Sequence, residues 1–306
     1  MRSAFYMFMC ISLFSCTNAT PEKPAVPKAE IKAPDIDKSL ADIIGAVKAD
    51  IGVAIIGPGG DVVAVNGDKP YAMMSVCKFP QALTLLRLVD VGTLSIDERV
   101  EISPEDLKPN TRSTLKKDHP QASFDLSIPE ALSYSIGQSD NITSNVIFRM
   151  EGGPDVVETY MHAKGISDIG INIDYTEFTD ETVDSNWCYP KAMAQLLEKF
   201  YAKQMLGEKT QTLLWDAMVN STSGPDRLKG LLPPGTVVAH KTGSSGTDKK
   251  TGAIIATNDV GIVMLPDGRH FSIAVFVADS YETKEATANV IARIARAAWD
   301  SYVSLK

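Results

Sequence analysis

The segments that look like β-strands lie near both ends of this chain, and they constrain its fold more than any other feature. Two apolar runs, at 51–56 and 61–65, flank the turn sequence Gly57-Pro58-Gly59-Gly60 and predict a β-hairpin. Strand patterns return only late in the chain, at 236–241, 256–265 and 271–277. A single antiparallel sheet built from both ends of the chain is therefore expected, with the middle of the chain inserted between its strands.

Helical periodicity fills that middle section, at 79–91, 129–136, 142–150, 154–162 and 190–200. Two further helical segments, 37–49 and 285–303, lie beside the strand segments. The predicted fold class is α+β, with an antiparallel sheet flanked by terminal helices and an inserted all-helical lobe. The sheet lobe would span about 37–68 and 220–306, and the helical lobe about 69–219. A functional site is expected between the two lobes, because clefts form at such interfaces.

Composition removes several classes of protein. The 306 residues are 44% hydrophobic and 22% charged, which is ordinary for a globular protein and excludes collagen-like and disordered chains. The net charge of −8, without a Lys/Arg-rich run, argues against a nucleic-acid partner. No metal or other cofactor is predicted, because the histidines lack metal-ligand spacing. Whether Cys77 and Cys188 form a disulfide stays open, because a sequence does not supply the geometry.

The N-terminus carries a targeting pattern. Arg2 precedes a short apolar stretch at 4–14, which is too short to span a bilayer and is typical of a signal peptide over residues 1–15. Leu13-Phe14-Ser15-Cys16 resembles the lipobox of bacterial lipoproteins, which implies cleavage before Cys16 and lipidation of its thiol. Proline-rich residues 16–36 then predict a lipid anchor and tether. A periplasmic location, membrane contact only through Cys16 and a monomer are expected, with simple secretion as the alternative.

Three short motifs carry the chemistry. They are Ser75-Val76-Cys77-Lys78, Ser139-Asp140-Asn141 and Lys241-Thr242-Gly243. By average composition an S-x-x-K motif occurs by chance about once in a chain of this length, whereas each specific triple has roughly a few per cent chance. Their joint occurrence, each in a suitable predicted element, indicates one shared site.

The first motif suits nucleophilic catalysis. Ser75 and Lys78 are three residues apart, so on a helix their side chains share a face. A serine hydroxyl attacks well only when a base removes its proton, and a lysine does this when its pKa is lowered. Burial and a second cation, Lys241, would both lower the pKa of Lys78. The structural alternative is an N-cap serine beside a solvated lysine.

The other two motifs suit substrate binding. Ser139 and Asn141 would point to the same side of an extended loop, and the alternative is an Asx-type turn that only caps the next helix. Lys241 and Gly243 alternate with Thr242 along a strand, where the glycine lets a substrate approach the backbone.

Together the motifs resemble those of class A serine β-lactamases, a plan that penicillin-binding proteins share. The resemblance spans about 37–303 and is closest from 224–227 through 240–243 to 256–259 and 265–268, where the chain is similar to the extended-spectrum branch with PER, VEB and CblA-like enzymes. It implies a β-lactam substrate, no cofactor and a covalent intermediate on Ser75. D,D-peptidases and non-hydrolysing β-lactam sensors share the motifs and remain alternatives.

The resemblance also implies roles for individual residues. Ser139 would protonate the ring nitrogen and Asn141 would hold the side-chain amide of the substrate. The backbone N–H groups of Ser75 and Ser244 would form the oxyanion hole. The substrate carboxylate would be bound by Lys241 and Thr242, with support from Arg227.

One expected residue is missing. The family places a glutamate seventeen residues before a helix-opening proline, and counting back from Pro190 gives Ile173, which cannot act as a base. Glu177 is the favoured candidate for activating the deacylating water, with Glu181, Asp180 or no equivalent as alternatives. Arg112 would occupy the slot of an aromatic gate residue.

Overall fold

The structure is a computed structural model that describes residues 36–108, 111–120, 123–179 and 181–305. The predicted signal peptide, Cys16 and the tether up to residue 35 lie outside the described residues, as does Asp180. Helix α1 (Ile36–Gly45) begins one residue before the predicted start of the domain, and the Ile36 side chain is only 2% exposed. Residue 36 therefore belongs to the folded body and not to the tether. No helix in the described part of the chain is long and apolar enough to cross a membrane.

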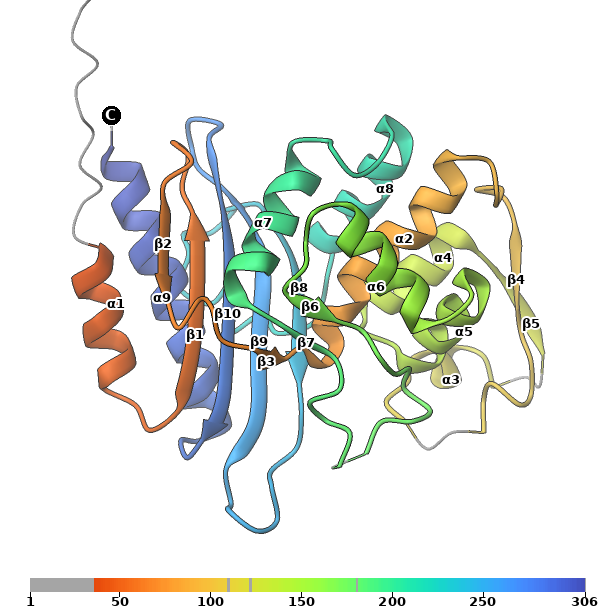
Figure 1. The fold of residues 1–306 in the computed structure, drawn as a ribbon, viewed down its shortest axis with the longest axis horizontal. Coiled ribbons are helices and arrows are strands. Elements are labelled where there is room, and N and C mark those ends of the chain that lie inside the picture. Colours follow the sequence, from red (N-terminus) through yellow and green to blue (C-terminus); the bar gives the residue numbers. More distant parts are fainter. Residues whose placement is uncertain (1–35, 109–110, 121–122, 180, 306) are drawn as a thin grey trace, which may run out of the picture. The chain divides into compact units, whose positions relative to one another are not determined.

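The five-stranded sheet joins both ends of the chain, as predicted (Figure 1). Its strand order is β2–β1–β10–β9–β8, and all neighbouring strands are antiparallel. The strands are β1 (Asp50–Ile56), β2 (Val62–Val65), β8 (Val238–Ser244), β9 (Ile254–Met264) and β10 (His270–Ser280). Because β8 lies at the edge of this sheet, one side of its backbone faces away from β9.

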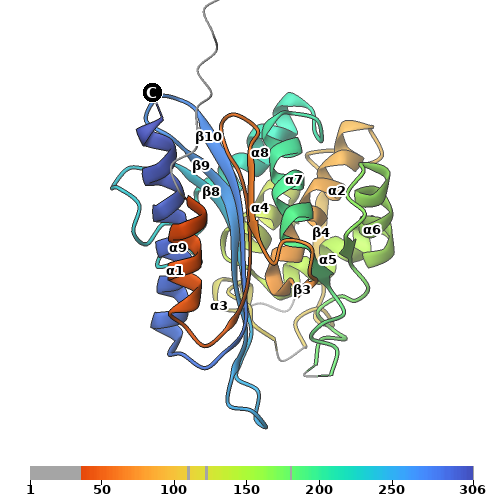
Figure 2. The ribbon, with the colours of Figure 1, turned by 60° about the vertical axis from the view of Figure 1, so that its left-hand side comes forward.

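Both faces of the sheet are covered, which explains why its strands appear in the sequence as continuous apolar runs. Helices α1 and α9 (Lys284–Ser304) pack on one face (Figure 2). Within β1, Ile51, Val53 and Ile55 belong to the core on that side, whereas Ala54 and Ile56 belong to the core on the opposite side. Successive side chains of a strand point to opposite faces, so two cores require apolar residues at nearly every position.

The opposite face contacts the inserted lobe. Helix α7 (Pro190–Tyr201) packs on β1, β9 and β10, and α8 (Glu208–Val219) packs on β8. The remaining helical segments are η1 (Met74–Cys77), α2 (Lys78–Asp90), α3 (Leu115–Asp118), α4 (Ile128–Leu132), the π-helical turn η2 (Ser133–Gly137), α5 (Asn141–Glu151) and α6 (Pro154–Ala163).

The prediction of an all-helical lobe is wrong in two places. β4 (Arg99–Ile102) pairs with β5 (Phe124–Ser127), and β7 (Trp187–Cys188) pairs with both β3 (Tyr71–Ala72) and β6 (Ile169–Gly170). These strands have two to four residues, which is too short to show a period of two. Helix α8 was also not predicted.

Glu151, the last residue of α5, leads to a prediction about stability. Its side chain is buried, neither carboxylate oxygen has a hydrogen-bond partner among the described residues, and burial raises its pKa well above the usual value. The folded protein therefore keeps Glu151 protonated while the unfolded chain releases the proton above about pH 4.3. The stability that the proton carries is fully present below that pH and is lost as pH rises.

Glu151→Gln removes this proton requirement. The variant is expected to be more stable than the wild type at pH 7, because it folds without having to take up a proton at this position. The gain should vanish near pH 4, and denaturant unfolding at both pH values measures it. The exposed Glu101 on β4 gives the control variant Glu101→Gln. An equal effect of both substitutions, or a Glu151→Gln effect independent of pH, would contradict the interpretation.

Candidate active site

Ser75 lies in the 3₁₀ turn η1, directly before α2. Residues i and i+3 of a 3₁₀ turn eclipse one another, so Lys78 lies next to Ser75, and its Nζ is 3.2 Å from Ser75 Oγ. Ser75 is half-buried and Lys78 is fully buried. Met74, just before Ser75, has a φ of 51°, a left-handed conformation that non-glycine residues rarely adopt and that is frequent at functional sites. Ser75 and Lys78 therefore lie side by side, as their spacing predicted. The alternative of a solvated lysine is wrong, because Lys78 is buried.

Lys78 is held by the segment that contains Ser139 and Asn141 and by the loop that contains Tyr175. Its Nζ donates to the Ser139 carbonyl oxygen at 2.9 Å and to Asn141 Oδ1 at 2.6 Å, and lies 4.4 Å from the centre of the Tyr175 ring. Burial is the main reason why the pKa of Lys78 is lowered to about 7, and the charge of Arg112 lowers it further. Cys77 and Asp140 act in the opposite direction. A large share of the Lys78 side chains is therefore neutral near pH 7 and able to accept a proton.

Ser139 and Asn141 face the lysines, while Asp140 between them faces away. Ser139 has a φ of 60°, a second left-handed residue in the site. Asp140 caps α5 by accepting from Thr143 N at 2.9 Å, and it also accepts from Leu115 N at 3.0 Å and Ser113 Oγ at 2.6 Å. The helix-capping alternative is thus true of Asp140, and this cap fixes the two residues beside it.

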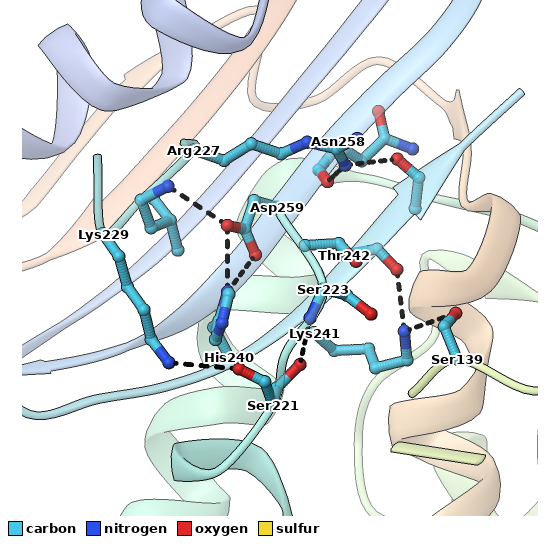
Figure 3. A network of polar contacts seen from close by, with 12 residues as sticks. Ser139, Ser221, Ser223, Arg227, Lys229, His240, Lys241, Thr242, Asn258 and Asp259 are labelled. Atoms are coloured by element: carbon cyan, nitrogen blue, oxygen red, sulfur yellow. Dashed lines mark hydrogen bonds and ion pairs between the residues drawn. The ribbon is translucent and has the colours of Figure 1, made fainter. Parts of the chain in front are cut away.

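Lys241 lies within β8 and not at its end as predicted, because β8 continues to Ser244. Its Nζ donates to Ser139 Oγ and to the Thr242 carbonyl oxygen, both at 2.9 Å (Figure 3). Burial first and the charge of Lys78 second lower the pKa of Lys241 well below its usual value. Each lysine therefore contacts one serine hydroxyl of the site: Lys78 contacts Ser75, and Lys241 contacts Ser139.

Gly243 lets β8 lie directly against the segment before Ser75. A Cβ at this position would be 2.4 Å from the Met73 carbonyl oxygen. In the antiparallel ladder, Ser245 N bonds to Ala256 O, and hydrogen-bonded pairs alternate with pairs that are not bonded. The N–H of Ser244 therefore points to the free edge of β8, as an oxyanion donor requires.

Asn258 is a positioning residue to which the sequence analysis gave no role. From β9 it reaches across β8, and its Nδ2 donates to the carbonyl oxygens of Ala72 at 2.8 Å and Met73 at 3.2 Å. It thereby ties the segment before Ser75 to the sheet. Two bonds from one side chain to a distant backbone leave no periodic signal in the sequence.

Arg227 stabilises the end of β8 through hydrogen bonds to β8 and β9 (Figure 3). Its Nη1 donates to the carbonyl oxygens of Gly243 at 2.8 Å and Asn258 at 2.7 Å, and its Nη2 donates to Ser244 Oγ at 2.6 Å. Deeper in the sheet, His240 Nδ1 is paired with the Asp259 carboxylate at 2.9 Å, with both side chains fully buried. These contacts fix the strand that carries Lys241 and Ser244.

A pocket of about 100 Å³ opens at these residues. It contains five predicted site residues and Arg112, which agrees with the expected gate position; the full lining is Met74, Ser75, Arg112, Ser139, Asn141, Tyr175, Phe178, Thr242 and Ser244. Lys78 and Lys241 lie directly behind it, through their contacts with Ser75 and Ser139. Among the residues that the structure describes, no carboxylate lines this pocket.

The structure does not place Glu177 among the residues that line the pocket at Ser75, and its role as the base for the deacylating water stays a prediction. Glu177 is exposed and is not part of the pocket lining. Glu181 is also exposed and lines a separate cavity of about 1010 Å³, beside Lys69 and Trp187. Sequence spacing alone could not show this, because the path of the loop depends on contacts with distant residues.

The side chains of Asn186 and Asn145 fix the path of this loop. Asn186 Oδ1 accepts from the backbone N–H of Asn172 at 2.8 Å and Ile173 at 3.1 Å, and Tyr175 N donates to Asn145 Oδ1 at 2.8 Å. Ile173 is buried, and the Tyr175 ring lies over Lys78 where a carboxylate was expected. No pattern in the sequence predicted a role for Tyr175 itself.

Both described cysteines are buried free thiols, so the structure contains no Cys77–Cys188 disulfide. Cys77 Sγ is 3.2 Å from Tyr175 Oη, and burial raises the pKa of Cys77. Cys77 is therefore a small residue of the hydrophobic core.

Known proteins are similar to this chain in fold and in sequence. A model of the β-lactamase enzyme family matches residues 35–302. The chain is 38% identical to β-lactamase VEB-1 and 37% identical to extended-spectrum β-lactamase PER-1, both from Pseudomonas aeruginosa, over 87% and 88% of its length and 89% and 87% of theirs. The crystal structure of the TLA-3 extended-spectrum β-lactamase superposes with a TM-score of 0.86 at 38% identity, and the match covers 89% of this chain and all of that one. The protein therefore belongs to the β-lactamase family, in the class A branch that includes VEB-1 and PER-1.

Proposed function

We propose that this β-lactamase works by covalent catalysis with Ser75 as the nucleophile. The observation that carries the proposal is the pair formed by Ser75 Oγ and the buried Lys78 Nζ, 3.2 Å apart, together with the lowered pKa of Lys78. Neutral Lys78 takes the hydroxyl proton as Ser75 Oγ attacks the lactam carbonyl. The carbonyl oxygen becomes an oxyanion and accepts hydrogen bonds from the N–H groups of Ser75 and Ser244.

Opening of the ring requires a proton on its nitrogen. Ser139 Oγ supplies it and is resupplied through Lys241, whose Nζ donates to that oxygen at 2.9 Å. The products of this half-reaction are an ester on Ser75 and a free ring amine. A water molecule then hydrolyses the ester and regenerates Ser75.

The charges around the pocket favour an anionic substrate. Arg112 lines the pocket, Lys241 lies directly behind it, and no described lining residue is acidic. Lys241 and Thr242 bind the substrate carboxylate, Asn141 holds the side-chain amide, and the edge of β8 beside Gly243 pairs with the backbone-like part of the substrate. Arg227 contributes by holding Ser244 in place. Penicillins and cephalosporins carry these groups, and resistance to them is the expected role.

The setting of this activity is also a proposal. The signal-like residues 1–15 and the lipobox-like sequence ending at Cys16 support secretion to the periplasm and attachment through one lipidated cysteine. The enzyme acts as a monomer without a metal or other cofactor, because every group used in the reaction comes from one copy of the chain.

Nitrocefin hydrolysis by the purified protein tests the proposal. We expect many turnovers per enzyme molecule, with a lower kcat/KM below pH 7 as Lys78 becomes protonated. A D,D-peptidase would instead cleave D-alanyl-D-alanine peptides and release one nitrocefin equivalent. A sensor would also stop after one equivalent, without peptide cleavage. Either result would overturn the proposed hydrolase.

A further inference from the structure

The pocket at Ser75 is too small to enclose a whole β-lactam. Its volume is about 100 Å³, whereas sites that enclose a drug-sized ligand have volumes of about 300–1,000 Å³. The reacting ring and its carboxylate would occupy this space, beside Ser139 and Thr242, and the acyl side chain would extend across the rim. The residues at the rim therefore determine which acyl side chains the enzyme favours.

Arg112 lies at this rim and adds a positive charge to it. It is exposed, and it is the only cationic residue in the described part of the pocket lining. Its backbone is tied to Asn141: the Arg112 carbonyl oxygen accepts from Asn141 N at 3.1 Å, and Oγ1 of the preceding Thr111 accepts from Asn141 Nδ2 at 2.7 Å. Because Asn141 is the proposed partner of the side-chain amide, the acyl side chain leaves the pocket next to Arg112.

Tyr175 and Phe178 form an aromatic part of the same lining. Both come from the loop before α7, and their ring centres are 6.2 Å apart. Phe178 is only half-buried, so part of its surface is open to a ligand. An acyl side chain with an aromatic ring and a carboxylate would be complementary to both features of the rim, since the ring can stack on Phe178 while the carboxylate pairs with Arg112.

The charge of Arg112 is close enough to affect both lysines of the site. Burial is the largest cause of the lowered pKa values of Lys78 and Lys241, and the charge of Arg112 lowers both further. This mutual repulsion is relieved when anions bind. The carboxylate on the ring of the substrate neutralises one charge, at Lys241. A second carboxylate can neutralise Arg112, whose guanidinium matches the two oxygens of a carboxylate with two parallel N–H donors.

We propose that Arg112 is a specificity residue that binds a carboxylate on the acyl side chain of the substrate, and that it thereby raises kcat/KM selectively for β-lactams with this second acid. The inference rests on the proposed acylation of Ser75 by a β-lactam. The ring carboxylate is bound by Lys241 and Thr242 and the side-chain carboxylate by Arg112, so each anion has its own cation. The resemblance to class A enzymes implied an aromatic residue in this slot, which has no charge, and the selectivity is therefore a property of this chain.

A matched pair of penicillins, tested on the full-length protein, examines this selectivity. Carbenicillin is benzylpenicillin with a carboxylate on the benzylic carbon, next to the side-chain amide, so the two substrates differ only in the second acid. The ratio of their kcat/KM values is measured for the wild type, Arg112→Gln and Arg112→Lys. Arg293→Gln is the control, because Arg293 is exposed on α9, which packs on the other face of the sheet.

We expect the ratio of carbenicillin to benzylpenicillin to fall about threefold to fivefold in Arg112→Gln, as is typical of an ion pair at an exposed rim. Arg112→Lys keeps the charge but not the paired donors, so its ratio should lie between those of Arg112→Gln and the wild type. Arg293→Gln should keep the wild-type ratio. Raising the ionic strength from about 0.05 M to about 0.5 M should lower the wild-type ratio toward that of Arg112→Gln, since salt screens an exposed ion pair.

An unchanged ratio in Arg112→Gln would overturn the inference, as would an equal loss in Arg293→Gln, which would indicate an effect of net charge alone. A wild-type ratio that does not respond to salt would also overturn it. These outcomes leave the proposed function standing, because both penicillins still react. Failure of both penicillins to acylate Ser75 would instead refute the proposed function, and the inference with it.

Discussion

Ser75→Ala is expected to lower β-lactam hydrolysis by on the order of 10⁴-fold or more, because it removes the only atom that forms the covalent intermediate. The variant should fold normally. The Ser75 side chain is half-buried, and Lys78 Nζ, which contacts its hydroxyl, keeps the Ser139 carbonyl oxygen and Asn141 Oδ1 as acceptors when the hydroxyl is removed. Replacement of Ser75 by alanine therefore leaves no buried hydrogen-bond donor without a partner. Nitrocefin turnover and thermal unfolding together measure both expectations.

Ser75→Cys is the matched control for this prediction. A thiol keeps a nucleophile at the same position, so this variant should still form a covalent adduct although it turns over poorly. Hydrolysis by Ser75→Ala within about tenfold of the wild type would show that another residue, or an activated water, attacks the lactam.

Gly243→Ala is expected to have the second-largest effect. Its Cβ would meet the Met73 carbonyl oxygen at 2.4 Å and Met74 Cβ at 3.0 Å, so β8 and the segment before Ser75 must move apart. The N–H of Ser244 then no longer converges with that of Ser75 on the oxyanion. Loss of one such donor costs about 10²–10³ in rate, and the overpacking costs about 1–3 kcal/mol of stability. Stopped-flow acylation and denaturant unfolding measure the two effects.

Gly246→Ala, two residues beyond the end of β8, provides the control. An added Cβ at Gly246 meets no atom within 4 Å, so acylation and stability should both stay close to the wild-type values. If Gly243→Ala acylated as fast as Gly246→Ala, the close approach of β8 to Met73 would have no catalytic role.

The larger elements could be predicted because their sequence patterns are long. Helix α9 shows its helical period over 21 residues, and the strands β9 and β10 are buried almost continuously over eleven residues each. The short pairs β3–β7, β6–β7 and β4–β5 escaped prediction because their pairing is set by tertiary contacts and not by local pattern.

In the site, too, local motifs could be predicted and long-range contacts could not. Ser75 and Lys78 could be paired from their spacing alone, and the motifs around Ser139 and Lys241 could be assigned to the same site by resemblance. The roles of Asn258 and Tyr175 depend on contacts across more than ninety residues of sequence, to the segment at 72–77, and spacing carries no trace of them. The position of Glu177 was equally hard to predict, because the contacts of Asn186 and Asn145 help to determine where its loop runs.

The most direct test of the account is to mix the protein with a β-lactam, quench the reaction after milliseconds to seconds, and locate any adduct by intact mass and peptide mapping. We expect an adduct with the mass of the whole β-lactam, on the peptide that contains Ser75, which forms first and then disappears as product accumulates. Product formation without this adduct, or an adduct on any other residue, would contradict it.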